Sequence, residues 1–311
     1  MQKKQKTAFT KKDTDYRMNT KLFSAAIAAA TTLLPLAAQA QITPASNTFT
    51  DNAANSAYAS GYNAGQGGST PGFGAFNVAT TGPSAGTFVF SAVDSEGGKG
   101  TPAPSSIDSS SKSFGIFANS DPTSSTTVTR TFAAPTQASG LNVAGDTFSL
   151  DFVTGYNDGN ATVGTATPTN PGDGSGHAGV ALTTAAGTVG SFLYQSNNQY
   201  LFNGSVVQGQ NFTTGALHLL YTLNSPTMYS LQVSGPFQFN GTGTFSTPIT
   251  GFQVQQANSG GGDGTHNAFF NNLAFTAAPA AVPEASSSIG FGLLLALGGL
   301  AVVARKRSVK A

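Results

Sequence analysis

Carboxyl groups that could act as a catalytic pair are scarce in this 311-residue chain. Hydrolysis of a glycosidic bond needs two of them, about 5 to 9.5 Å apart. Asp94 and Glu96 lie two positions apart in the loop-like DSEGGKG, and Glu96 is the only glutamate between residues 41 and 283. Asp151 alternates with the apolar positions of TFSLDFV, so it should face away from the core. We therefore expect a protein that is not an enzyme, with a glycosidase built on Glu96 as the less favoured alternative.

Candidate metal ligands are also few. The chain has no cysteine, and its three widely spaced histidines form no His-x-x-x-His pair, which argues against zinc. Calcium takes six to eight oxygen ligands, and the Gly/Asn/Asp-rich stretch 154–176 contains several. The candidates are Asn157, Asp158, Asn160 and Asp173. Because Asn and Asp populate turns for backbone reasons alone, we expect no cofactor, with calcium as the alternative.

Aromatic side chains offer a different chemistry, the stacking of sugar rings. There are 23 Phe, 8 Tyr and no Trp, and most of the Phe should form the core. The tyrosines that we expect to expose their rings are Tyr58, Tyr62, Tyr156, Tyr194 and Tyr200. Exposed rings beside polar loops would favour a carbohydrate-binding, lectin-like module.

The elements that would position these residues are short strands. Turn residues separate segments with alternating apolar side chains, and no window from residue 41 to 278 shows a helical period. Asn203-Gly204, Asn240-Gly241 and Ser234-Gly235-Pro236 are predicted turns. The predicted strands are 86–93, 113–118, 126–133, 145–153, 177–184, 188–195, 198–205, 216–223, 227–234, 236–241, 242–247, 251–257 and 269–276.

This density of strands predicts an all-β protein with a single β-sandwich of the jelly-roll type over residues 86–278. The strand lengths and the closing FFNNLAFT loosely resemble the concanavalin A-like lectin and glucanase sandwich. Residues 41–85, rich in Gly and Asn, are expected to form an irregular segment that packs on the edge of this domain.

Charge is concentrated at the two ends of the chain. Only three basic residues lie between residues 41 and 283, against ten acidic ones, which gives a net charge of −7. Such a region offers no basic patch for phosphates, so we expect no nucleic-acid partner.

The N-terminus has the pattern of a secretory signal peptide, residues 1–40. Basic residues up to Lys21 precede an apolar stretch, 22–38, and Ala38-Gln39-Ala40 is a small-residue cleavage pattern. Met18 opens a signal of ordinary length, so translation could start there. The pattern predicts export through the Sec translocon and cleavage after Ala40.

The C-terminus, residues 279–311, combines a short motif, an apolar run and a basic end. The uncharged run 289–304 would form a helix about 24 Å long, close to the roughly 30 Å of a bilayer core. The motif is Val282, Pro283, Glu284 and Ala285. The basic stop is Arg305, Lys306 and Arg307, which the positive-inside rule places on the cytoplasmic side.

This three-part tail resembles the PEP-CTERM sorting signal, although Ala285 stands where that family often has a second proline. The resemblance implies processing by an exosortase in a Gram-negative bacterium that makes exopolysaccharide. It implies an inner-membrane intermediate with a transmembrane helix, then release to the cell surface or extracellular matrix. We expect a non-enzymatic matrix or biofilm protein associated with exopolysaccharide.

Overall fold

The computed structural model describes residues 47–68, 70–92, 107–119, 121–133, 140–155, 157, 174–213, 215–260 and 266–279. All of them belong to one compact unit, Ala45–Pro279. The expected signal peptide and, from residue 280 on, the expected sorting tail belong to a second unit and lie outside the described residues. Within the described ranges, no helix has the length and apolar character needed to cross a membrane.

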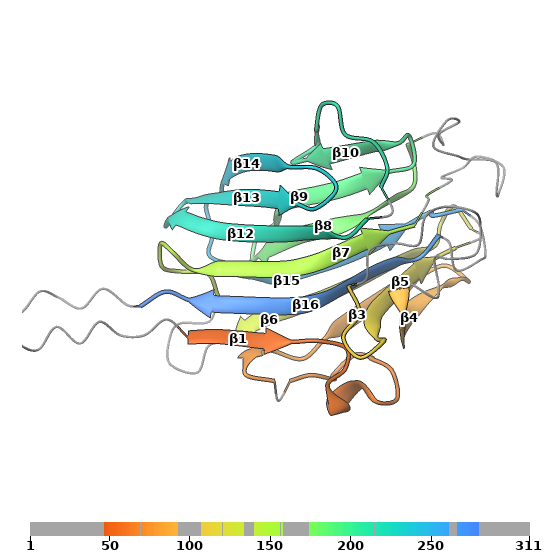
Figure 1. Cartoon of the computed structure of the whole chain (residues 1–311), viewed down its shortest axis with the longest axis horizontal. Coiled ribbons are helices and arrows are strands. Elements are labelled where there is room, and N and C mark those ends of the chain that lie inside the picture. Colours follow the sequence, from red (N-terminus) through yellow and green to blue (C-terminus); the bar gives the residue numbers. More distant parts are fainter. Residues whose placement is uncertain are drawn as a thin grey trace, which may run out of the picture. The chain divides into compact units, whose positions relative to one another are not determined.

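The described strands form two eight-stranded sheets, and the described pairs are antiparallel (Figure 1). The first sheet has the order β14-β13-β12-β7-β16-β5-β4. Both β5 and β1 pair with one edge of β16, β5 along its start and β1 along its end. The strands are β1 (Asn47–Asp51), β4 (Ala85–Phe90), β5 (Ser113–Ala118), β7 (Thr147–Thr154), β12 (Leu217–Ser225), β13 (Met228–Ser234), β14 (Phe239–Thr244) and β16 (Ala268–Ala277).

The second sheet has the order β11-β10-β9-β8-β15-β6-β2, and β3 also pairs with β6. Its strands are β2 (Gly72–Phe73), β3 (Asn77–Thr81), β6 (Ser125–Ala133), β8 (His177–Thr184), β9 (Gly187–Gln195), β10 (Gln199–Phe202), β11 (Ser205–Val206) and β15 (Ile249–Ala257). One 3-10 helix, η1 (Ser56–Tyr58), lies between β1 and β2.

The core lies between the two sheets, where aromatic rings from both interdigitate. Phe148 of β7 stacks on Phe252 of β15 at 4.6 Å between ring centroids. Phe132 of β6 lies 5.0 Å from both Phe148 and Phe275 of β16. All four rings are buried. The predicted all-β sandwich is therefore confirmed, and each sheet turns alternate side chains inward as the pattern required.

Of the two Asn-Gly pairs that were predicted to form turns, only one does so. Asn203 and Gly204 both have positive φ and join β10 to β11, so the predicted hairpin turn is confirmed. Asn240 and Gly241 lie inside β14 instead, so that turn prediction was wrong. Glycine is needed at position 241 because a Cβ there would come within 2.5 Å of the Phe202 ring. The residue serves a close contact and not a positive φ.

Residues 47–85 supply strands and core, although their composition suggested an irregular segment. Here β1 joins the first sheet, and β2 and β3 pair with β6 of the second. Tyr58 and Tyr62 pack edge-on against Phe114 of β5 at 4.9 and 5.0 Å. The described part of this segment thus belongs to the compact unit Ala45–Pro279.

A buried arginine holds this segment in place. Arg130 of β6 pairs with Asp51 at 2.6 Å, and both side chains are fully buried. The Arg130 guanidinium also donates to the carbonyl oxygens of Gly74 and Gly67, at 2.7 and 2.8 Å. It lies over the Phe76 ring at 4.3 Å. These contacts satisfy the buried charge and join β6 to the whole stretch that follows β1.

Candidate functional site

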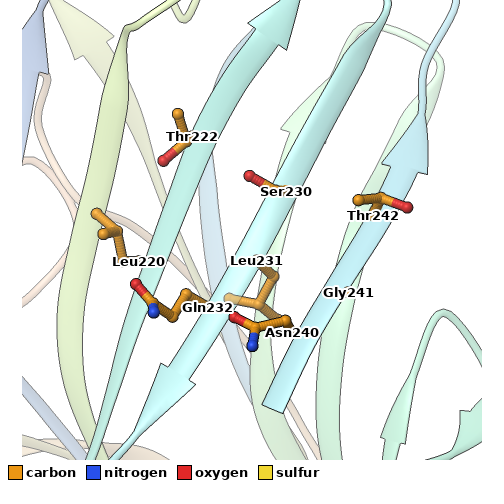
Figure 2. A pocket seen from close by; sticks show the side chains of 8 residues that line it. All are labelled: Leu220, Thr222, Ser230, Leu231, Gln232, Asn240, Gly241 and Thr242. Atoms are coloured by element: carbon orange, nitrogen blue, oxygen red, sulfur yellow. The ribbon is translucent and has the colours of Figure 1, made fainter. Parts of the chain in front are cut away.

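The outer face of the first sheet carries uncharged polar side chains at alternate positions. Thr222 of β12 is paired in register with Ser230 of β13, and Ser230 with Thr242 of β14. Figure 2 shows these three side chains in a line across the strands. Their alternate neighbours, Leu223 and Leu231 among them, are buried. The alternation of these strands therefore separates an apolar inner face from a hydroxyl-bearing outer face.

The line of hydroxyls continues across the rest of the sheet. Thr222 is in register with Thr147 of β7, Thr147 with Thr276 of β16, and Thr276 with Thr48 of β1. The hydroxyls of Thr48 and Thr276 are hydrogen-bonded at 3.0 Å. We call these six residues the hydroxyl row, namely Thr48, Thr276, Thr147, Thr222, Ser230 and Thr242.

A second row lies two residues further along each strand. Asn240 of β14, Gln232 of β13, Leu220 of β12 and Ser149 of β7 are in register with one another. The two amides lie next to each other on the outer face (Figure 2). Between the rows is a shallow groove of about 340 Å³. It is lined by Leu220, Thr222, Ser230, Leu231, Gln232, Asn240, Gly241 and Thr242.

A third row contains the only ionisable pair that the described residues place on this face. Nδ1 of His218 on β12 lies 2.8 Å from Oδ1 of Asp151 on β7. A carboxylate can only accept, so the ring donates from Nδ1, and Nε2 is left for another partner. This hydrogen bond raises the pKa of His218, and partial burial opposes it. Asp151 faces away from the core, as its alternation predicted.

Two further side chains extend this pair into a network. Asn272 of β16 donates from its amide to Oδ2 of Asp151 at 2.8 Å. Its carbonyl oxygen accepts from the hydroxyl of Ser109 at 2.8 Å. The network therefore links the outer face of the first sheet to the segment that joins β4 to β5.

The described part of that segment forms a wall over β7 and β16. Ile107 and Ala92 pack on Val153 and Phe269, which point outward from the first sheet, in a small apolar cluster of their own. Asn271 fixes the wall, because its amide donates to the carbonyl oxygens of Ile107 and Lys112 at 2.9 Å each. The polar rows and this wall therefore lie on the same outer face of the first sheet.

The structure tests some of the residues proposed from the sequence. Tyr58, Tyr62, Tyr194 and Tyr200 are buried, so the prediction that they expose their rings was wrong. Each occupies an inward position next to other aromatic side chains, where burial of the ring outweighs its polar hydroxyl. Tyr156, Asp94 and Glu96 lie outside the described residues.

Of the calcium candidates, only Asn157 is described. It is buried, and its amide makes no hydrogen bond to the described residues. Asp158, Asn160 and Asp173 lie outside the described residues, as do Ala38 and Ala40, the motif at 282–285 and the basic stop at 305–307. In the described ranges, no three His, Asp or Glu side chains gather as metal ligands would.

The sequence analysis missed the network of His218, Asp151, Asn272 and Ser109. Their distances along the chain are large, and only the register of β12 with β7 and of β16 with β7 brings them together. The Asn-Asn pair in the last strand was the one available signal, because two amides in an apolar strand indicate an interruption of its pairing.

Comparisons with known proteins found remote likenesses only. No protein-family model matches the chain, and no curated protein matches it in sequence. The winged bean acidic lectin complexed with methyl-alpha-D-galactose is 10% identical, with a TM-score of 0.38 over 76% of this chain and 100% of that one. An alginate lyase from Corynebacterium sp. is 8% identical, with a TM-score of 0.37 over 57% of this chain and 83% of that one. Neither the sugar binding of the one nor the lyase activity of the other is transferred to this chain.

Proposed function

We propose that this protein is an exported, non-enzymatic surface or matrix protein that binds exopolysaccharide on the outer face of its first sheet. The N-terminal pattern up to Ala40 and the tail motif at 282–285 support export and exosortase sorting. In this proposal the Sec translocon and the exosortase are transient partners, and the polysaccharide is the lasting one.

The observation that carries the proposal is the chemistry of the outer face. Hydroxyl and amide groups both donate and accept hydrogen bonds, as the hydroxyls of a neutral sugar do. The groove combines such groups, from Thr222, Gln232 and Asn240, with the apolar side chain of Leu220. A sugar ring has polar edges and apolar C–H faces, and a site of this mixed kind complements both.

Affinity electrophoresis tests the proposal. The protein, produced in its own host, is run through gels with and without exopolysaccharide purified from that host. We expect the polysaccharide to retard the native protein and to retard a Gln232→Ala/Asn240→Ala variant much less. The matched control is Gln253→Ala/Gln255→Ala, which removes two amides at the partly exposed positions of β15 in the second sheet. Equal mobility of the native protein in both gels would reject the proposal.

A lectin that binds one defined sugar is the second candidate, and the hydrogen-bond network of His218, Asp151, Asn272 and Ser109 favours it. Asp151, His218 and Asn272 present a compact set of directional hydrogen-bonding groups, with the His218 side chain 49% exposed. A glycan array would show a few strong hits that His218→Ala abolishes. The glycosidase alternative depends on Glu96, and activity that Glu96→Gln removes would be needed to support it.

A further inference from the structure

We infer that the polysaccharide crosses the strands along the hydroxyl row, and that it is bound as an extended, uncharged internal segment and not by a chain end. This inference rests on the proposed function, because it specifies the ligand class and its direction on the same face. Three features of the sheet support it, namely the register of six strands, the charge of the outer face and the edges at which the row stops.

The register places one hydroxyl on each of six neighbouring strands. Thr48, Thr276, Thr147, Thr222, Ser230 and Thr242 follow one another through five registered pairs. Adjacent strands are about 4.8 Å apart, so the row extends roughly 24 Å across the sheet. One sugar unit of an extended polysaccharide advances by a similar distance. The row thus offers a repeating contact to a repeating ligand.

The second row sets the width of the proposed binding surface. Gln232 and Asn240 stand two residues from Ser230 and Thr242 on the same strands, which is about 7 Å along an antiparallel strand. Hydroxyls on both edges of a sugar ring can therefore meet a partner. The strands of a sheet rotate by about 20–25° relative to one another, so the two rows coil. A single twisted chain can follow them, whereas a flat crystalline surface cannot.

The charge of the face selects an uncharged chain. Asp151 and His218 are the ionisable residues that the described strands place on it, and they are bonded to each other. Of the three basic residues between residues 41 and 283, Arg130 is fully buried, Lys112 lies in the wall and Lys99 lies outside the described residues. A polymer of uronic acids would find no cation in either polar row, and in the third row the imidazole of His218 is already hydrogen-bonded to the carboxylate of Asp151.

The ends of the row favour internal segments. β14 is the last strand of the first sheet on one side, and β1 pairs only with β16 on the other. The described part of the wall contacts β16 and β7, whereas the groove lies on β12, β13 and β14. A long chain can therefore enter over one edge and leave over the other.

A length series tests this inference. Exopolysaccharide from the producing strain is partially hydrolysed, and fragments of two to eight sugar units are titrated into the protein by calorimetry. We expect affinity to rise at least tenfold from two units to six, the number of hydroxyls in the row, and then to level off. Carboxyl-bearing fragments should bind no better than neutral ones of equal length.

Variants at opposite ends of the row locate the ligand. Thr48→Val and Thr242→Val should each weaken binding of six-unit fragments severalfold, and should leave two-unit binding within a factor of two, since short fragments can use the remaining positions. Thr127→Val, at a partly exposed position of β6 in the second sheet, is the control and should change neither.

The outcomes separate this inference from the function on which it rests. Two-unit fragments that bind as tightly as six-unit fragments would overturn the extended site and leave polysaccharide binding intact. A preference for acidic fragments would overturn the uncharged class. Failure of every fragment and of the intact polysaccharide to bind would overturn both.

Discussion

Arg130 shows how a single residue decides whether a stretch of sequence is ordered. It alternates in phase with Val128 and Phe132, so its inward orientation could be predicted from the strand pattern. Its partner could not, because Asp51 lies 79 residues earlier. The carboxylate of Asp51 also accepts a hydrogen bond from Tyr58 at 2.5 Å. Burial is the main cause that raises the pKa of this tyrosine, which therefore remains a donor.

Replacing Arg130 should destabilise the fold strongly. Arg130→Leu leaves the carboxylate of Asp51 buried without its cation, which typically costs about 3–5 kcal/mol. Urea denaturation would measure this loss. The double variant Arg130→Leu/Asp51→Leu should recover part of it, because no unpaired charge then remains. A loss below 1 kcal/mol in the single variant would contradict a structural role for the pair.

The pair of His218 and Asp151 predicts a dependence of stability on pH. The pKa of His218 is raised, so its protonated form is favoured by folding. The pair therefore stabilises the fold fully below the ordinary histidine pKa of about 6.5, and this stabilisation is lost as pH rises through the raised value.

NMR titration would check this prediction. His218 should titrate above His177, whose pKa is lowered by burial. His218→Gln should remove the corresponding step from a plot of melting temperature against pH. Titration of the two imidazoles in the opposite order would show that the hydrogen bond to Asp151 does not hold in solution.

At the scale of elements, β16 is the strand that organises the site. Its pairing with β7 contains a bulge between Asn271 and Ala274, and Asn272 adopts a positive φ of 51° there. The extra residue turns Asn272 toward Asp151 on the outer face, and Asn271 toward the wall. Because of the bulge, the side-chain amides of two successive residues donate hydrogen bonds to different partners, Asn271 to the wall and Asn272 to Asp151.

Asn271→Ala should loosen the wall. The change removes the acceptor of the Ala53 amide and the donor to the carbonyl oxygens of Ile107 and Lys112. The Asn272 amide also donates to the carbonyl oxygen of Ile107, and the Ser109 backbone amide to that of Lys112, so the Ala53 amide is the buried group that loses its partner. A buried group left without a partner costs about 1–3 kcal/mol. We expect lower stability in urea and faster hydrogen exchange around residues 107–112. Asn224→Ala, at an exposed position of β12, should change neither.

Strands and faces could be predicted from the sequence, whereas the site could not. Alternation in 147–154 and 217–225 indicated which side chains face outward. The pairing of these two strands brings together residues more than 60 positions apart, and no local pattern encodes that register. The early strands were missed because β1 to β3 are short and consist largely of small polar residues, whose order depends on Arg130 and on β16.

At the scale of the whole molecule, the expected cleavage at both ends determines the net charge of the mature protein. Removal of both basic ends would leave residues 41–283 with a net charge of −7 and with Arg130 buried. Such a protein would be repelled by anionic polymers and would bind neutral ones by hydrogen bonds and packing. Export, sorting and the outer face of the first sheet are thus parts of one proposal.

The most direct test is the intact mass of the protein recovered from the exopolysaccharide fraction of the producing strain. The account predicts that the protein is present in this fraction and that its mass corresponds to a chain from Gln41 to a C-terminus near Pro283. A protein that is absent from this fraction, or that carries the basic tail in it, would contradict the account.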